Sequence, residues 1–154
     1  MLNKRGTHLG ILAVFIPIGF AASLESLLAH YDVVSSGFCS FNSTFNCDIV
    51  NKSSYSELLG IPVAALGLLA NIVFIVGLIW LWRAKNDRVL TVMLALAVGG
   101  LTFSLYLTYI EAFVLYTWCL VCLSSLLAIV AITYSFFSIS RIDGKIIEPT
   151  INNQ

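Results

Sequence analysis

The segment WCLVC at residues 118–122 opens an apolar run that continues to Ile139. This run contains no Asp, Glu, Lys or Arg, and it is long enough to cross a hydrocarbon core, which needs about 20 helical residues. Two cysteines three positions apart form a spacing that is used for redox chemistry or for metal binding. If the helix begins near Thr117, both sulfurs lie in its first turn, where free N–H groups and the helix dipole stabilise a thiolate.

The composition is that of a membrane protein. Of the 154 residues, 59% are hydrophobic and 10% are charged, whereas soluble domains carry roughly 25% charged residues. We predict one all-α integral membrane domain over residues 1–154, a four-transmembrane-helix bundle whose outer loop forms a lid between the first two helices. The helices are expected at residues 9–28, 61–82, 89–113 and 118–139, the loop at 29–60, and a short disordered cytoplasmic tail at 140–154.

Basic residues indicate the orientation. If successive spans alternate in direction, seven of the eight lysines and arginines fall on one side and Lys52 falls on the other. The positive-inside rule then places both termini in the cytoplasm and the cysteines at the extracytoplasmic surface of the cell membrane, in an oxidising compartment. A cleaved signal peptide is the competing interpretation of the N-terminus, but the uncharged run from Leu9 to Leu24 is long for one.

Several polar residues within the spans have two interpretations. Glu25 and His30 are expected at the outer interface, with proton transfer as the alternative. Asn71 is expected to bond across helices, with a bound ligand as the alternative. The small residues Gly60 and Gly67 predict close approach of a neighbouring helix.

Aromatic residues gather near the predicted outer surface. We name Tyr106, Tyr109 and Trp118 as candidates for the wall of a pocket beside the cysteines at 119 and 122. An interfacial aromatic belt is the alternative. The sequence contains neither a phosphate-binding glycine loop nor a basic nucleic-acid face, and neither a nucleic-acid partner nor a metal is expected.

The cysteines Cys39, Cys47, Cys119 and Cys122 allow three interpretations. Four zinc ligands are disfavoured, because C-x7-C is an atypical ligand spacing. Two inert disulfides in a non-enzymatic membrane protein form the second interpretation. Two exchanging redox pairs form the third, which we favour because a structural disulfide needs no stabilised thiolate and because a cysteine pair beside lipid can meet a lipid-soluble electron carrier.

The order of these residues resembles the vitamin K epoxide reductase family in its prokaryotic single-domain form. The resemblance is carried by Cys39 and Cys47, Ser53, Gly60-Ile61-Pro62 and the C-x-x-C at 119–122, and it covers roughly residues 10–137. The DsbB-like thiol oxidases also have four helices, but their C-x-x-C stands in the first outer loop, so the order here does not match them.

The resemblance implies a relay from Cys39 and Cys47 through Cys119 and Cys122 to a quinone of the menaquinone or ubiquinone type. A separate thioredoxin-fold, DsbA-type partner would attack the loop disulfide at Cys39. Cys47 would then attack Cys119 and release Cys122 as the thiolate that reduces the quinone. Ser53 matches a family serine that would support the loop or the quinone site by hydrogen bonding.

Two departures from the family pattern limit what carries over. In animal members a tyrosine lies one helical turn after the second C-x-x-C cysteine and helps to hold vitamin K, but here that position is Leu126. This puts epoxide reduction by the same relay, the rival reaction, in doubt. No thioredoxin-like domain follows in this sequence, so we expect the partner to be a separate protein.

Overall fold

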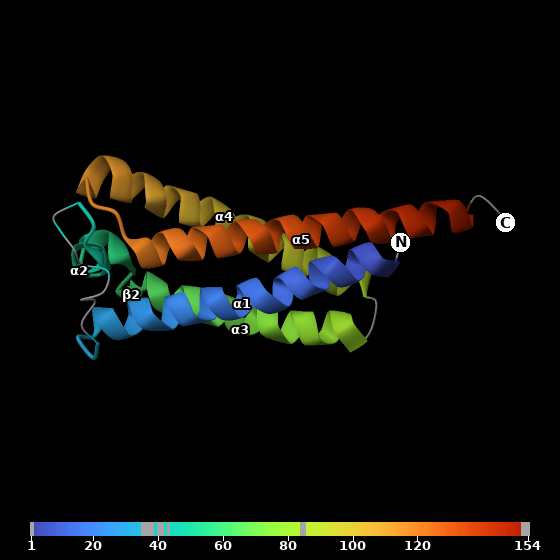
Figure 1. The fold of residues 1–154 in the computed structure, drawn as a ribbon, viewed down its shortest axis with the longest axis horizontal. Helices are drawn as coiled ribbons and strands as arrows, with labels where there is room; N and C mark the ends of the chain where they lie inside the picture. Colours follow the sequence, from blue (N-terminus) through green and yellow to red (C-terminus); the bar gives the residue numbers. More distant parts are fainter. Residues whose placement is uncertain (1, 35–38, 40–41, 43, 84–85, 152–154) are drawn as a thin grey trace.

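Four long helices lie side by side along the longest axis of the molecule (Figure 1). The structure is a computed structural model, which describes residues 2–34, 39, 42, 44–83 and 86–151. The long helices are α1 (Leu2–His30), α3 (Val63–Arg83), α4 (Asp87–Ile110) and α5 (Leu120–Ile151). Each contains a segment that is long and apolar enough to cross a membrane. The prediction of an all-α, four-helix membrane fold is therefore confirmed.

The remaining elements are short, and all of them lie at one end of the bundle (Figure 1). Within the segment that links α1 to α3, they are helix α2 (Cys47–Asn51), the 3-10 turn η1 (Ser54–Ser56), and strands β1 (Glu57–Leu58) and β2 (Ile61–Pro62). The π-helical turn η2 (Glu111–Leu115) directly follows α4. The segment that links α1 to α3 corresponds to the predicted loop at residues 29–60. Its described part, which we call the cap, covers the end of the bundle that carries the cysteines.

Packing between helices centres on α1 and α5. Helix α1 contacts both α5 and α3, and α4 contacts mainly α5. Phe74 of α3 meets Phe136 of α5 with ring centroids 5.9 Å apart. Gly67 of α3 faces Ser23 of α1 so closely that a Cβ added to the glycine would lie 2.9 Å from the serine Oγ. The expectation of a close helix approach at Gly67 is therefore confirmed.

Gly60 has a different role from the one predicted. It lies in the turn between β1 and β2, which pair antiparallel, and its φ of 79° follows a φ of 56° at Leu59. Two successive positive φ angles fit the tight hairpin turn in which glycine is favoured. The second long helix accordingly begins at Val63 and not at Ile61.

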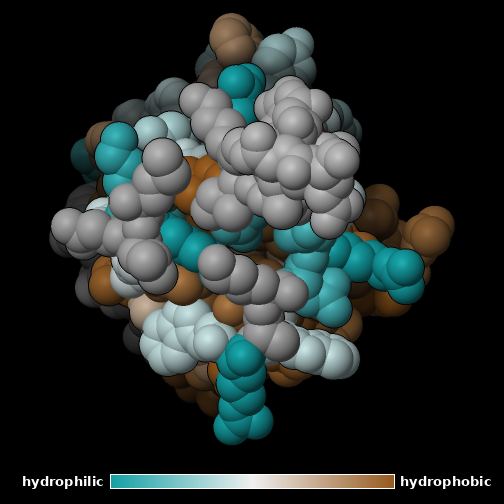
Figure 2. Space-filling view, turned by 90° about the vertical axis from the view of Figure 1, so that its right-hand side faces the viewer, coloured by the Kyte–Doolittle hydropathy of each residue, from teal (hydrophilic) through white to brown (hydrophobic). Residues whose placement is uncertain are grey.

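Charged residues mark the opposite end of the bundle, where the N-terminus and the end of α5 lie (Figure 1). Figure 2 views this end and shows hydrophilic residues across it and hydrophobic ones around its flanks. Here Arg5 of α1 and Asp143 of α5 form an ion pair at 3.7 Å, with only 12% and 10% of their side chains exposed. Helix α5 continues to Ile151, so the prediction of a disordered tail is wrong for residues 140–151.

Candidate functional site

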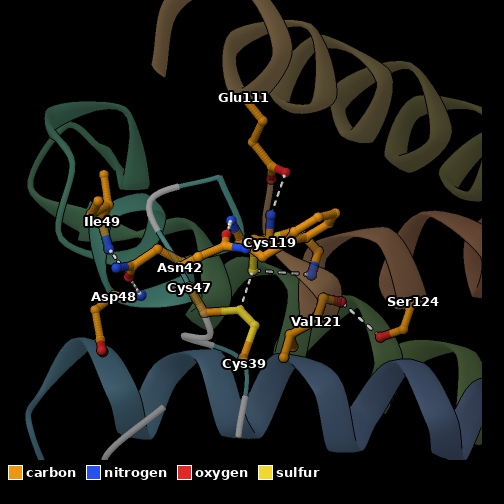
Figure 3. The surroundings of a disulfide bond; sticks show 12 residues. Cys39, Asn42, Cys47, Asp48, Ile49, Glu111, Cys119, Val121 and Ser124 are labelled. Carbon is orange, nitrogen blue, oxygen red and sulfur yellow. Dashed lines mark hydrogen bonds between the residues drawn. A yellow bond between two sulfur atoms is a disulfide. The ribbon is translucent and has the colours of Figure 1, made fainter. Parts of the chain in front are cut away.

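Three sulfur atoms meet beneath the cap. Cys39 and Cys47 form a disulfide with their Cα atoms 5.7 Å apart. The Sγ of Cys119 lies 3.1 Å from the Sγ of Cys47, and a dashed line marks this contact in Figure 3. Cys39 and Cys119 are 0% exposed and Cys47 is 1% exposed, so this cluster is closed to water. A free thiol at this distance from a disulfide sulfur is in position for thiol–disulfide exchange.

Backbone pairing holds the cap against the start of α5. Phe45 and Trp118 form a parallel β-bridge. The Trp118 N–H donates to Thr44 O at 2.8 Å, and the Asn46 N–H donates to Trp118 O at 3.2 Å. Because Cys47 follows Asn46 and Cys119 follows Trp118, this pairing sets the two cysteines next to each other.

Asn46 also starts helix α2. Its Oδ1 accepts the N–H groups of Asp48 and Ile49 at 3.0 and 3.2 Å. Asparagine is among the preferred N-cap residues because its side chain satisfies N–H groups that the first helical turn leaves free. Asn46 therefore fixes where α2 begins, and Cys47 is the first residue of this helix.

Cys119 caps α5 and does not lie inside it. The helix begins at Leu120, and the Cys119 carbonyl accepts its first backbone bond, from Leu123 N at 2.9 Å. The Cys119 Sγ accepts the Cys122 N–H at 3.3 Å, which is the N-cap arrangement with sulfur in place of oxygen. The predicted helix start at residue 118 is therefore two residues early, and only Cys122 lies in the first turn.

Glu111 is the functional candidate to which the sequence analysis gave no role. It is 3% exposed, and its Oε2 accepts the Cys119 N–H at 3.1 Å. The Cys122 thiol also interacts with its carboxyl group. The change from α-helix to π-helix begins at this residue, and Figure 3 shows its side chain extending toward Cys119. In the sequence, the feature that could have indicated Glu111 is its position as a single carboxylate in an apolar run, because charged residues within membrane spans mark functional sites. The π-turn that the structure adds is also frequent at functional sites.

A cavity of about 500 Å³ lies between the helices and the cap. Cys122, Glu111 and Ser53 line it together with largely apolar residues, and it extends as far as Phe74 and Ile132. Its volume lies within the range of small-molecule pockets, which are mostly apolar with a few polar groups. The flat ring and apolar tail of a quinone fit both this volume and this lining.

Other polar residues predicted from the sequence meet at this cavity. The Ser53 Oγ donates to Val50 O at 2.8 Å. His30 at the end of α1 interacts through Nδ1 with Asn51 O at 2.8 Å, so it contacts the cap. Asn71 Nδ2 donates to Gly67 O at 2.8 Å and to Ser23 Oγ at 3.4 Å, which confirms the expected bond across helices. All three side chains also line the cavity.

The aromatic candidates lie elsewhere. Tyr106 and Tyr109 are 53% and 57% exposed, and neither they nor Trp118 are among the residues that line the cavity. Phe103 and Leu107 line it instead. The face of a helix repeats every three to four residues, so the tyrosines point away from the bundle, where aromatic residues at a membrane interface are expected.

The sulfur cluster offers little to a metal ion in this state. Three sulfur atoms lie within 4.8 Å of one another, those of Cys39, Cys47 and Cys119. Two of them are bonded to each other, and metal binding requires thiolates. Cys122 is not part of this group, so the structure does not assemble the four cysteines into one set of ligands.

Comparison with known proteins identifies a family. The family model described as "Vitamin K epoxide reductase family" matches residues 10–137. The matched region includes all four cysteines, Ser53 and Glu111. No curated protein matches the chain.

Proposed function

Because this chain belongs to the vitamin K epoxide reductase family and is a membrane oxidoreductase, we propose that it is a quinone-dependent thiol oxidase that drives disulfide formation in exported proteins. The observation that carries the proposal is the 3.1 Å distance between the Sγ atoms of Cys47 and Cys119. A disulfide whose only task is to hold a loop needs no free thiol at that distance. Cys122, three residues on, faces a cavity that fits a quinone.

The first step takes electrons from a separate thioredoxin-fold partner. A thiolate of the partner attacks Cys39, the Cys39–Cys47 bond breaks, and a second partner thiol completes the partner's own disulfide and releases Cys39. Cys39 is 0% exposed, so the cap has to open to admit the partner. The loop cysteines are then both reduced.

The second step passes the electrons to the C-x-x-C pair. Cys47 attacks Cys119 in the Cys119–Cys122 disulfide and releases the Cys122 thiolate, and Cys39 then displaces Cys119 from Cys47. The result is a loop disulfide beside two free thiols, which is the arrangement of the cysteines in this structure. A quinone bound beside Cys122 would take two electrons and two protons from this pair, so that the Cys119–Cys122 disulfide forms again. Ser53 supports this geometry within the cap, where its Oγ donates to Val50 O beside the cavity.

The compartment follows from the same proposal. The cysteine end faces the extracytoplasmic side of the cell membrane and both termini face the cytoplasm, as the positive-inside rule indicates. An oxidising compartment is where a thiol oxidase finds its substrates.

A coupled assay tests the function. The purified full chain in lipid nanodiscs is mixed with a reduced DsbA-type protein and with menadione or decylubiquinone. We expect loss of partner thiols in step with quinone reduction in the wild type, and neither change in a Cys119→Ser variant. A wild type that oxidises the partner without consuming quinone, or that does neither, contradicts the proposal. Turnover of vitamin K epoxide in place of quinone reduction would favour the rival reaction.

A further inference from the structure

The carboxyl group of Glu111 occupies the junction between the redox cysteines and the cavity. It accepts the Cys119 N–H at 3.1 Å, it interacts with the Cys122 thiol, and it lines the cavity. A carboxylate that is 97% buried costs free energy unless it is paired. A glutamine would accept the same N–H without a charge, so this hydrogen bond alone does not explain why an acid stands here.

The proposed reaction has to move protons at this place. Two S–H bonds break, one S–S bond forms between Cys119 and Cys122, two electrons pass to the quinone, and two protons reach its oxygens. The Cys119 thiol is closed to water, and the Cys122 thiol faces the cavity that the quinone would fill, so bulk solvent does not supply these protons directly once the quinone is bound. A group that touches both the thiol and the cavity has to carry at least one of them.

We propose that Glu111 is the proton-transfer residue of the C-x-x-C pair, taking the proton of the Cys122 thiol and passing it to a quinone oxygen in the cavity. The proposal rests on the quinone-linked function above. Cys122 is left as the thiolate that gives up electrons, and the proton of Cys119 reaches the second oxygen. Glu111 returns to its carboxylate form when it passes the Cys122 proton to the quinone oxygen.

Among the described residues, the other titratable side chains that line the cavity besides Cys122 are His30 and Tyr55, and neither interacts with Glu111. The groups that interact with it are the backbone N–H of Cys119, which precedes α5, and the thiol of Cys122 in the first turn of that helix. The cap faces the cluster with the Cys39–Cys47 disulfide, which does not titrate. His30 of α1 also lines the cavity, but its ring interacts with Asn51 O and with Glu57 Oε1, the latter at 3.4 Å.

The test compares Glu111→Gln with Glu111→Asp in protein whose C-x-x-C pair has been reduced. The amide keeps an acceptor for the Cys119 N–H but cannot carry a proton, whereas the shorter acid can. General acid–base groups contribute about 10²- to 10⁴-fold. We therefore expect Glu111→Gln to reduce menadione about 100-fold more slowly in a single turnover and to lose the pH dependence of that step, with partial recovery in Glu111→Asp. Glu25→Gln is the matched control, because Glu25 lies in a membrane span but not at the cavity.

A second readout needs no quinone. The rate at which iodoacetamide alkylates Cys122 reports whether the thiolate is still formed and accessible. Removing a neighbouring negative charge does not disfavour a thiolate, so alkylation in Glu111→Gln should be at least as fast as in the wild type. Equal menadione rates in both proteins, or a parallel loss of alkylation that reveals a collapsed site, would overturn the role of Glu111. A wild type that reduces neither menadione nor decylubiquinone overturns the proposed function, and this role with it.

Discussion

Cys47 and Cys119 are 72 residues apart in the chain, yet their Sγ atoms lie 3.1 Å apart. The backbone pairing of the cap with residue 118 produces this contact, because each cysteine directly follows a paired residue. The cap is therefore more than a cover for the cavity. It aligns the loop disulfide with the one free thiol that can exchange with it.

The side chain of Asn46, the N-cap residue of α2, should control the alignment of the loop disulfide with Cys119. In Asn46→Ala, α2 loses the side chain that accepts the N–H groups of Asp48 and Ile49, at a cost of about 1 kcal/mol. We expect exchange between the loop disulfide and Cys119 to slow about fivefold, while a reduced C-x-x-C pair still reduces menadione at the wild-type rate. Rapid-quench alkylation followed by mass spectrometry measures the exchange.

Asn86→Ala is the matched control for that prediction. Asn86 caps α4 with the same geometry, accepting from Arg88 N and Val89 N at 3.1 and 3.2 Å, but it lies at the opposite end of the bundle from the cysteines. The two variants should lose similar stability, and only Asn46→Ala should slow exchange. A similar loss of exchange rate in both variants would show that the Asn46 side chain acts only through global stability.

Gly19 should be essential for the packing of α1 on α3. A Cβ at this position would lie 2.8 Å from Asn71 Oδ1, and the Asn71 side chain is held by its bonds to Gly67 and Ser23. We expect Gly19→Ala to lower the free energy of unfolding by roughly 1–3 kcal/mol, seen as a lower melting temperature in detergent. Gly10→Ala in the same helix meets nothing within 4 Å and should not destabilise; equal melting temperatures for the two variants would refute the contact.

Phe103, and not the neighbouring tyrosines, should contribute to quinone binding. Phe103 lines the cavity, and fully burying such a side chain is worth about 1.5–3 kcal/mol. We expect Phe103→Ala to raise the KM for decylubiquinone about fivefold to tenfold, because the ring is only half-buried. Tyr106→Ala, on the exposed face of α4, should leave this KM unchanged. A raised KM in Tyr106→Ala with an unchanged KM in Phe103→Ala would contradict this prediction and favour the tyrosines as residues of the pocket wall.

The sequence predicts the bundle well because uncharged apolar runs leave few alternatives. Its errors come from partners that are distant in the chain. Asp143 is buried against Arg5 of α1, so charged residues that suggest a free tail instead belong to the end of a longer helix. The cap on α5 is a cysteine, which the usual N-cap preferences do not include, and the helix therefore starts later than expected.

The sequence predicts the four cysteines of the site but not its acidic residue, Glu111. Spacing and family resemblance together indicate the four cysteines and their order. Glu111 receives no role from the sequence because its place beside Cys119 depends on the π-turn η2 and on the chain reversal that follows at Tyr116, where φ is 51°. No local pattern predicts that reversal.

The most direct test of the relay is to capture the bond between Cys47 and Cys119. In Cys122→Ser, Cys119 still lies beside Cys47 of the loop disulfide but can no longer pair with Cys122. When Cys119 attacks Cys47, the Cys39–Cys47 bond breaks and Cys39 is released as a free thiol. Native-state treatment with iodoacetamide, followed by digestion without reduction and mass spectrometry, should yield a Cys47–Cys119 cross-link with alkylated Cys39, and no cross-link in Cys119→Ser/Cys122→Ser. An intact Cys39–Cys47 disulfide with an alkylated Cys119 would contradict the relay.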